Sequence, residues 1–214
     1  MHYSRFNTII TFDLHDVVFT FDYKKILHIL WTTDRKWPLI TTIAYPRFIW
    51  NFIKLLRQKP SDYDIFILFS EQRPVLVPVA LDLMSAIKVI PETVQIIQEL
   101  SDKEYTLHIL TNATEIRLLD IRKKYAHLLR KFRYCKGITT PSNPLGRKPH
   151  ALFFHEYLDK AKKLAQTDFP LKNVIFIDDN KENIKTAQKV GMKAIHFQSP
   201  QQLREALVEL GILP

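Results

Sequence analysis

The sequence predicts an α/β fold in which a parallel sheet is flanked by helices and a small helical segment is inserted after the first strand. Two observations predict it. Short apolar runs that end in polar residues alternate with helical periodicity near the start of the chain and again from residue 88 to residue 210. The stretch from residue 21 to residue 86 lacks this alternation and carries aromatic-rich apolar segments separated by prolines and charges. We therefore predict an α/β core, residues 1–20 and 87–214, and a helical cap, residues 21–86.

The elements of the core follow from the apolar pattern in order. A β-rich run at residues 8–12 ends at Asp13 and predicts a buried first strand. Pro91 begins a helix that runs to residue 100 and leads into a strand at 105–110. Thr111, Asn112 and Thr114 offer capping groups for the next helix, so we expect Thr111 at its amino terminus. The remaining predicted elements are a strand at 135–139, a helix at 150–163, a strand at 173–177, a helix at 181–190 stopped by Gly191, a strand at 193–197 and a helix at 200–210.

Composition places the chain among folded globular proteins. Of its 214 residues 46% are hydrophobic and 25% are charged, and the 4 Gly against 12 Pro argue against flexible linkers. The single cysteine, Cys135, excludes a disulfide within the chain and is expected to be a small buried side chain. The apolar stretch from Trp37 to Ile53 is interrupted by two prolines and an arginine, so we expect a packed helical pair and no membrane span. These features predict a cytoplasmic protein.

The chain is basic, with a formal net charge of +9 at pH 7. Part of this charge is concentrated in residues 117–136, where Asp120 is the one acidic residue. A positive field favours anionic partners. No nucleic-acid motif and no groove of interleaved aromatic residues accompanies the charge, which argues against a nucleic-acid partner. We expect a solvated basic helix face.

Four short motifs occur in a fixed order, and each one ends or closely follows an apolar run. Singly, each motif is more often a cap or a turn than a catalytic group. Because the carboxyl ends of parallel strands meet at one edge of a sheet, however, we expect the four motifs to lie together. They are Phe-Asp-Leu-His-Asp at 12–16, Leu-Thr-Asn at 110–112, Arg-Lys-Pro at 147–149 and Ile-Asp-Asp-Asn-Lys-Glu-Asn at 177–183.

The residue types in these motifs suit phosphoryl transfer. Asp13, at a strand end, can attack phosphorus and form an acyl phosphate. A divalent cation must offset the repulsion between this carboxylate and a phosphate, and Asp178 and Asp179 add the oxygen ligands that Mg²⁺ prefers. The charge of the transferred group can be held by three further residues, Thr111, Asn112 and Lys148.

With these residues the chain resembles phosphatase-type members of the haloacid dehalogenase (HAD) superfamily, whose Rossmann-like core carries a cap after the first motif. The segment from Phe12 to Val18 is similar to the branch that contains the amino-terminal phosphatase of soluble epoxide hydrolases. The resemblance covers residues 5–20 and 88–210. Beyond the motifs it extends to Gly137-Ile138-Thr139, Asn183, Ala187 and Gly191-Met192.

The resemblance implies a role for each motif residue. It implies that Asp13 is the nucleophile and a magnesium ligand, with the His15 backbone carbonyl and Asp178 as further ligands. Lys148 would neutralise the phosphoryl group and orient the nucleophile. Two pairs would assist: Thr111 and Asn112 in holding the phosphoryl group, and Asp179 and Asn183 in supporting the metal shell. The implied substrate is a small phosphorylated metabolite.

His15 is where the chain departs from the family pattern. Phosphatase members usually carry there an Asp that protonates the leaving group and then activates water. Imidazole can perform the same proton transfers, so we take His15 as a hypothetical substitute. The alternative is that His15 only fills space or contacts substrate, which would leave a slow enzyme or a binding protein. Asp16 is a poor substitute, since strand alternation would turn it away.

Two competing interpretations remain open. A catalytically silent relative could use the same pocket, or the basic stretch, to bind an anion or a partner, although intact Asp13, Lys148 and Asp178 argue against it. A carbon–halogen hydrolase would also lack the second acid, but it would not need the Asp178-Asp179 pair.

Overall fold

The computed structural model describes residues 3–32, 62–139, 143–165 and 173–214, together with residues 47, 50, 51, 54 and 170. The chain divides into two compact units. The core unit consists of residues 1–20 and 89–214, and the inserted unit consists of residues 21–88. Across the described ranges, no helix combines the length and the apolar character that crossing a membrane requires.

The core unit is built on a five-stranded sheet in the order β5-β4-β1-β6-β7. Every neighbouring pair is parallel, with β1 in the middle between β4 and β6. All residues of β1 and β6 are buried, as expected for strands covered on both faces. The predicted α/β fold with a parallel sheet is thus confirmed. The strands are β1 (Ile9–Phe12), β4 (Thr106–Thr114), β5 (Phe132–Ile138), β6 (Val174–Asp178) and β7 (Lys193–His196).

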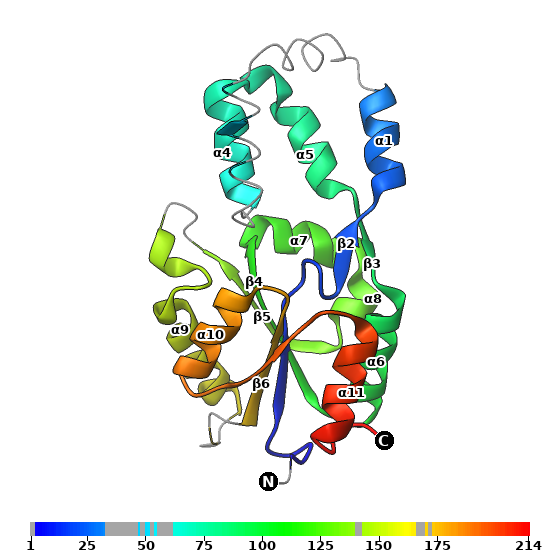
Figure 1. The fold of residues 1–214 in the computed structure, drawn as a ribbon, viewed down its shortest axis with the longest axis vertical. Helices are drawn as coiled ribbons and strands as arrows, with labels where there is room; N and C mark the ends of the chain where they lie inside the picture. The colour runs from blue at the N-terminus through cyan, green and yellow to red at the C-terminus, as the bar shows by residue number, and fades with distance from the viewer. Residues whose placement is uncertain are drawn as a thin grey trace. The chain divides into compact units, whose positions relative to one another are not determined.

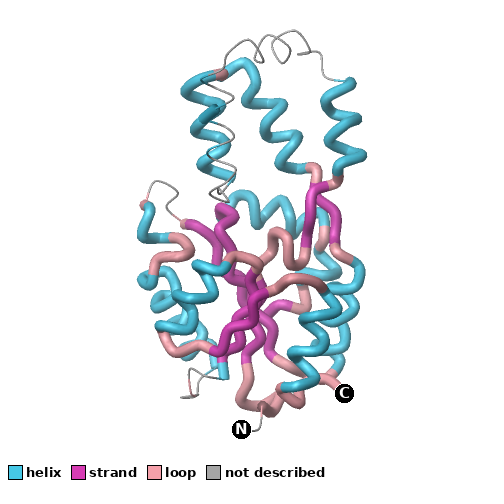
Figure 2. The backbone as a smooth tube through the Cα atoms, viewed as in Figure 1, coloured by secondary structure: helices cyan, strands magenta, loops and turns pink. Residues whose placement is uncertain are grey.

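Helices cover both faces of this sheet (Figures 1 and 2). On one face α9 (Ala151–Ala165) and α10 (Lys181–Lys189) pack on a buried cluster that includes Phe154, Tyr157 and Phe176. On the other side α6 (Pro91–Asp102) contacts α11 (Pro200–Glu209), and an Arg204–Glu99 ion pair joins them. The remaining elements of the core unit are α7 (Glu115–Lys124), α8 (Ala126–Leu129) and a short 3-10 helix, η2 (Pro144–Gly146).

The boundary between β4 and α7 differs from the prediction. Thr111 lies inside β4, and Thr114 is the residue that caps α7, its Oγ1 accepting a hydrogen bond from Arg117 N–H at 3.2 Å. The expectation that Thr111 begins a helix was therefore wrong. The strand is longer because β5 continues to pair with it as far as Thr114, beyond an irregularity that follows Leu110. Pairing with a neighbouring strand prevailed over the local capping signal.

Gly137 allows β5 to approach the end of β4 closely. A Cβ atom at this position would lie 2.6 Å from the Ala113 carbonyl oxygen and 2.7 Å from Leu118 Cδ1, which is too near for any side chain. The Gly137 N–H instead donates to Glu115 Oε1 at 3.1 Å. This contact lies at the point where β4 passes into α7.

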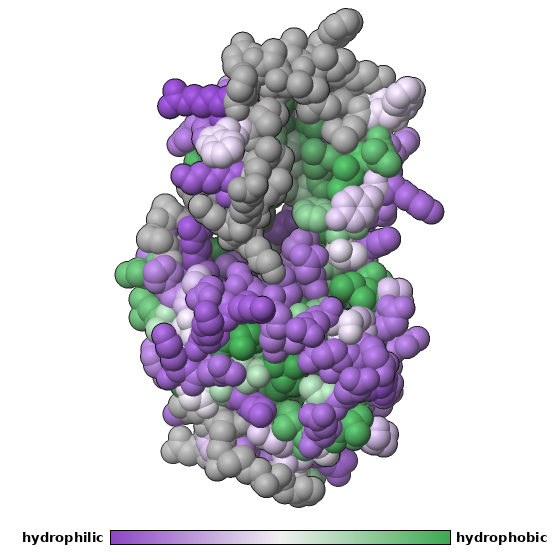
Figure 3. Space-filling model, in the orientation of Figure 1, coloured by the Kyte–Doolittle hydropathy of each residue, from purple (hydrophilic) through white to green (hydrophobic). Residues whose placement is uncertain are grey.

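The basic stretch 117–136 is only partly a solvated face. Arg122, Lys123 and Lys124 are exposed, and hydrophilic side chains cover much of the visible face of the core unit (Figure 3). Lys136, however, is buried, with its Nζ 2.9 Å from Glu156 Oε2 and above the ring of Phe153. This pairing was missed because the acid comes from α9, outside the stretch.

The described part of the inserted unit is mainly helical. It contains α1 (Tyr23–Thr32), α4 (Asp62–Gln72), a 3-10 helix η1 (Pro74–Leu76) and α5 (Val77–Ser85). Phe69, Leu76 and Ala80 form its buried cluster. Of the predicted helical pair between residues 37 and 53, only residues 47, 50 and 51 are described, and the rest lies outside the described residues.

A two-stranded sheet that the sequence did not predict lies where the chain enters and leaves the inserted unit. It consists of β2 (Phe19–Phe21) and β3 (Ile87–Val89). Next to it, Asp22 N–H donates to the Ala86 carbonyl oxygen at 2.7 Å. Each strand has only three residues, which is too short for a periodic pattern to be recognised.

A buried polar cluster lies between the sheet and α9. The Tyr157 hydroxyl oxygen is 2.5 Å from Thr11 Oγ1 and 3.0 Å from His108 Nδ1. The ring of Tyr134 stacks on that of Tyr157, with centroids 6.2 Å apart. Burial, together with the positive charge of Arg133, lowers the pKa of His108 to about 4. The imidazole is therefore neutral near neutral pH.

We expect the neutral state of His108 to make the folded protein less stable in acid. The pKa of His108 is 6.5 in the unfolded chain and about 4 in the folded protein, so protonation between these pH values favours the unfolded chain. This group should lower the free energy of unfolding by about 3 kcal/mol as the pH falls through that range. In His108→Phe, the free energy of unfolding should lack this part of its decrease with falling pH. Denaturant unfolding of both proteins across the range measures it, and equal slopes would contradict the expectation.

Candidate active site

The four sequence motifs converge at the carboxyl end of the parallel sheet. Asp13 directly follows β1, Thr111 lies in β4 and Asp178 ends β6. Lys148 comes from the segment between β5 and α9. Because β1 lies between β4 and β6, with Phe12 opposite both Ile109 and Ile177, the strands deliver these groups to one place.

Lys148 is the buried centre of the site. Its side chain is 1% exposed, and its ammonium donates to Asp178 Oδ2 at 2.6 Å and to the Leu110 carbonyl oxygen at 2.9 Å. The same nitrogen lies 3.0 Å from Asp13 Oδ1, which also accepts a hydrogen bond from Leu14 N–H at 2.7 Å. The ammonium therefore joins the ends of β1, β4 and β6.

Both carboxylate oxygens of Asp178 accept hydrogen bonds. Its Oδ2 accepts from Lys148 Nζ and, at 2.9 Å, from Asn183 Nδ2. Its Oδ1 accepts from Asn180 N–H at 2.7 Å and from Asn183 Nδ2 at 3.0 Å. Asn183 lies in the first turn of α10, and the Asn180 side chain caps that helix by accepting from Glu182 N–H at 2.9 Å. The capped helix thus holds the carboxylate that anchors Lys148.

Burial and neighbouring charges change the pKa values of Asp13 and Lys148. Desolvation raises the pKa of Asp13 well above its usual range, and the Asp178 carboxylate adds to the rise, although Lys148 opposes it. The Lys148 pKa is raised above its ordinary value because the two carboxylates outweigh the effect of its own burial. The lysine is therefore a permanent cation, whereas the ionised form of Asp13 is stabilised less than in water.

Asn112 holds the backbone of Lys148. Its Oδ1 accepts from Lys148 N–H at 2.8 Å, and its Nδ2 donates to the Lys148 carbonyl oxygen at 3.0 Å. The sequence predicted that Asn112 contacts the phosphoryl group. In the structure its side-chain amide positions the lysine, a role that has no signature in the order of motifs.

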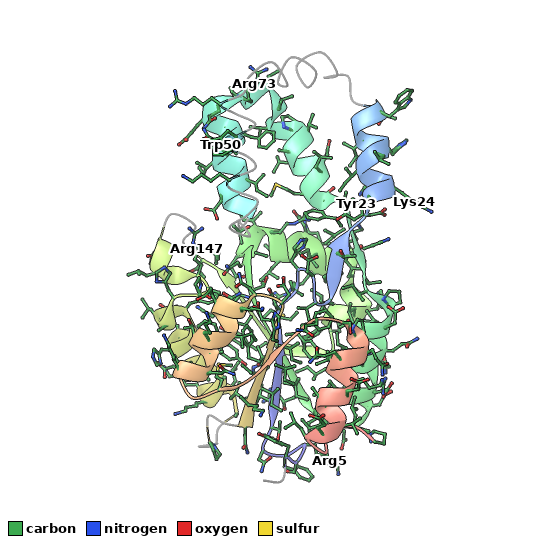
Figure 4. The ribbon with its side chains drawn as sticks, viewed as in Figure 1. Arg5, Tyr23, Lys24, Trp50, Arg73 and Arg147 are labelled. Atoms are coloured by element: carbon green, nitrogen blue, oxygen red, sulfur yellow. The ribbon has the colours of Figure 1, made fainter. Side chains whose placement is uncertain are left out.

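Thr111 lies beside the cluster with a side-chain hydroxyl that can still donate a hydrogen bond. The residue is 3% exposed, and its Oγ1 accepts from Ala113 N–H at 3.2 Å. Arg147, just before Lys148, is half-buried at the same end of the core unit (Figure 4). The site can therefore present a hydroxyl donor and cationic side chains to an anion.

His15 and Asp16 lie in the turn that follows Asp13. The Asp16 N–H donates to the Phe19 carbonyl oxygen at 2.7 Å, and Asp16 adopts a positive φ of 55°, a region that Asp tolerates better than most residues. The His15 side chain is 46% exposed, with Nε2 3.7 Å from Asp16 Oδ2. Unlike Asp13 and Lys148, this pair is solvated.

Asp179 brings a third carboxylate to the site. One carboxylate oxygen from each of Asp13, Asp178 and Asp179 lies within 4.8 Å of the other two. The His196 Nε2 is 3.1 Å from the Asp179 carbonyl oxygen. Backbone groups such as Leu14 N–H and the Leu110 carbonyl complete the site, and the sequence could not reveal them because any residue carries such groups.

We expect Asp178→Asn to destabilise the fold much more than Asp13→Asn. Both oxygens of Asp178 accept hydrogen bonds, so an amide nitrogen at either position would face a donor and leave the buried lysine with one carboxylate. The loss in the free energy of unfolding should be about 3 kcal/mol. Asp13→Asn removes a carboxylate that burial already disfavours and should cost less than about 1 kcal/mol. Urea unfolding of the two variants measures this, and equal losses would contradict it.

Solved structures share this fold at low sequence identity. A HAD-family enzyme from Bacteroides thetaiotaomicron, in complex with magnesium and inorganic phosphate, has a TM-score of 0.59 at 16% identity and covers 90% of this chain and 94% of its own. A HAD-superfamily hydrolase from Ehrlichia chaffeensis has a TM-score of 0.57 at 16% identity and covers 98% of both chains. The L-2-haloacid dehalogenase of Xanthobacter autotrophicus, with chloropropionic acid covalently bound, has a TM-score of 0.56 at 15% identity, covering 97% of this chain and 85% of its own.

No curated protein matches the sequence. The family model for haloacid dehalogenase-like hydrolases matches residues 77–197, more than half of the chain, and includes Thr111, Lys148 and Asp178. The chain belongs to the haloacid dehalogenase-like hydrolase family.

Proposed function

We propose that this hydrolase cleaves small phosphate monoesters in a magnesium-dependent reaction that passes through an aspartyl phosphate on Asp13. The observation that carries the proposal is the buried Lys148 ammonium, held between Asp13 and Asp178 beside a third carboxylate, Asp179. Such an arrangement suits a reaction in which a negatively charged group is brought to a carboxylate. A small phosphorylated metabolite is the proposed substrate, and the cytoplasm the proposed setting.

The donor set fits a magnesium ion. Three clustered carboxylates against one ammonium leave an excess of negative charge that a divalent cation balances. Among the described residues, Asn183 Oδ1 has no hydrogen-bond partner although it is buried, and a water bound to the ion could donate to it. We propose Asp13, Asp178 and the His15 carbonyl as ligands, with Asp179 and Asn183 in support. When bound, the ion would offset the charge of the substrate phosphate and make its phosphorus more electrophilic.

The residues of the chain divide the chemistry between them. Asp13 attacks phosphorus, the P–O ester bond breaks, and the leaving alkoxide takes a proton from His15. A water then attacks the aspartyl phosphate and returns a proton to His15, which releases inorganic phosphate and restores Asp13. Lys148 orients the nucleophile throughout, and the Thr111 hydroxyl donates to the phosphoryl group. We propose that the inserted unit acts as the cap that selects the substrate.

Hydrolysis of a carbon–halogen bond is the second candidate. Similarity to a haloacid dehalogenase and the missing second acid at position 15 favour it. The Asp178-Asp179 pair weighs against it, because a metal-free displacement gains nothing from clustered carboxylates. Halide release from 2-haloacids in the presence of a chelator would support this candidate over the phosphatase.

We expect phosphate release from phosphorylated metabolites to require both magnesium and Asp13. Asp13→Asn removes the nucleophile and should lower turnover by at least about 1,000-fold. Chelation of magnesium should reduce it to background. The measurement is phosphate release from a broad panel of phosphate monoesters by folded wild-type and variant proteins.

The matched control is Asp159→Asn, which removes an exposed carboxylate on α9 and should leave turnover unchanged. Turnover that survives chelation would contradict the magnesium mechanism. Turnover retained by Asp13→Asn would exclude Asp13 as the nucleophile. If no member of the panel is hydrolysed, the catalytically silent alternative becomes the better description.

We expect His15→Ala to slow alkyl phosphates far more than p-nitrophenyl phosphate. An alkoxide needs a proton as it leaves, whereas p-nitrophenolate does not, so only the alkyl substrates lose the benefit of a general acid, about 100-fold to 10,000-fold. Release of the alcohol or phenol in the first turnover measures this step alone. His15→Asp should retain the rate on both substrates. An equal loss on both, or no loss, would mean that His15 is not the proton donor.

A further inference from the structure

A pocket of about 130 Å³ lies at the amino ends of β1, β4 and β5. It is at the opposite end of the strands from the candidate active site, since Ile9 begins β1 and Asp13 follows its end, about 13 Å away at the usual rise per residue. Figure 4 marks the two ends of the core unit by Arg5, next to the pocket residue Phe6, and by Arg147. The polar lining includes Thr8, His108 and Arg133, and the apolar lining includes Ile9, Ala161 and Leu164.

His108 is one of the residues that line this pocket, and its side chain has a buried nitrogen. The residue is 1% exposed, and its Nε2 has no hydrogen-bond partner in the part of the chain that the structure describes. If the Thr11 hydroxyl donates to Tyr157 and the Tyr157 hydroxyl donates to His108 Nδ1, both hydroxyl hydrogens are used. The reverse direction would leave the Thr11 hydrogen without an acceptor in the cluster. The neutral imidazole therefore carries its proton on Nε2, which needs an acceptor.

Arg133 supplies the charge of the pocket. Its Nη2 donates to the Leu164 carbonyl oxygen at 3.2 Å, at the carboxyl end of α9, which fixes the guanidinium beside the pocket. Among the described residues that line the pocket, none carries a carboxylate. The nearby Arg5 is already paired, with Nη1 2.6 Å from Glu104 Oε2. The lining thus combines one positive charge with one buried neutral donor.

The volume of the pocket and its apolar lining limit the kind of ligand that fits. A cavity of roughly this volume holds a molecule of about six heavy atoms. Ile9, Ala161 and Leu164 would cover a short hydrocarbon chain, while the donors of His108 and Arg133 would face a carboxylate. We infer that this pocket binds a short-chain monocarboxylate, separately from the reaction at Asp13.

The first experiment follows the His108 ring by two-bond ¹H–¹⁵N correlation NMR while propionate is added to the full-length protein. The His108 signals are assigned by their absence in His108→Phe. Propionate should shift the Nε2 signal in a saturable way, and acetate should bind more weakly because it covers less of the apolar wall. Sodium chloride at equal ionic strength is the control for non-specific anion effects. If propionate shifts the signal no more than chloride does, the inference is wrong.

Two variants test whether propionate binds in this pocket or at another anion site. Arg133→Gln keeps an amide donor for the Leu164 carbonyl but removes the charge, and it should weaken propionate binding about tenfold. Arg130→Gln, an exposed arginine that does not line the pocket, is the matched control and should leave binding unchanged. Equal binding by wild type and Arg133→Gln would overturn the assignment.

Binding to the candidate active site is the remaining alternative. Propionate binding should persist in Asp13→Asn and in the presence of magnesium and inorganic phosphate, because the pocket lies at the other end of the sheet. Loss of binding under either condition would place the carboxylate at the active site and overturn the inference. Since the readout is a ring signal and not turnover, the result does not depend on the proposed phosphatase reaction.

Discussion

The buried ammonium of Lys148 is the interaction on which the candidate active site depends. It connects Asp13 after β1, the Leu110 carbonyl in β4 and Asp178 at the end of β6. Neither carboxylate could be buried at so small a separation without this cation, because desolvation and mutual repulsion both oppose their charge. The strand order that places β1 between β4 and β6 is what lets one side chain reach all three. The strand order therefore determines where the site forms. Asn112 holds the backbone of Lys148, and Asn183 holds the carboxylate of Asp178.

Burial affects the two carboxylates of the site, Asp13 and Asp178, differently. The raised pKa of Asp13 shows that its ionised form is less stable here than in water, and a carboxylate freed from hydration is a better nucleophile. Asp178, in contrast, is satisfied by three surrounding donors and serves as a fixed anchor. The two carboxylates therefore differ in the number of hydrogen-bond donors around them. This asymmetry fits a mechanism in which one carboxylate reacts and the other stays in place.

Much of the core and most residues of the site could be predicted from the sequence, because strands that end in polar groups leave a strong pattern. The pattern failed where pairing with another strand decides the structure: β4 extends through Thr111 because β5 pairs with it up to Thr114. It failed again for β2 and β3, whose three-residue length carries no periodicity. The hydrogen bonds of Asn112 to the Lys148 backbone, and the orphan donor on His108, depend on side-chain directions that no local sequence pattern records.

The short β2–β3 sheet has an architectural consequence. Because the first and last residues of the inserted unit are already paired, by Asp22 N–H to the Ala86 carbonyl among others, the length of chain between them adds little to the entropy of closing that loop. The segment can therefore grow, shrink or be exchanged as a cassette while the five-stranded sheet keeps its register. The residues at the ends of β1, β4 and β6 lie outside this segment, so their arrangement would stay the same in a chain with a different insertion.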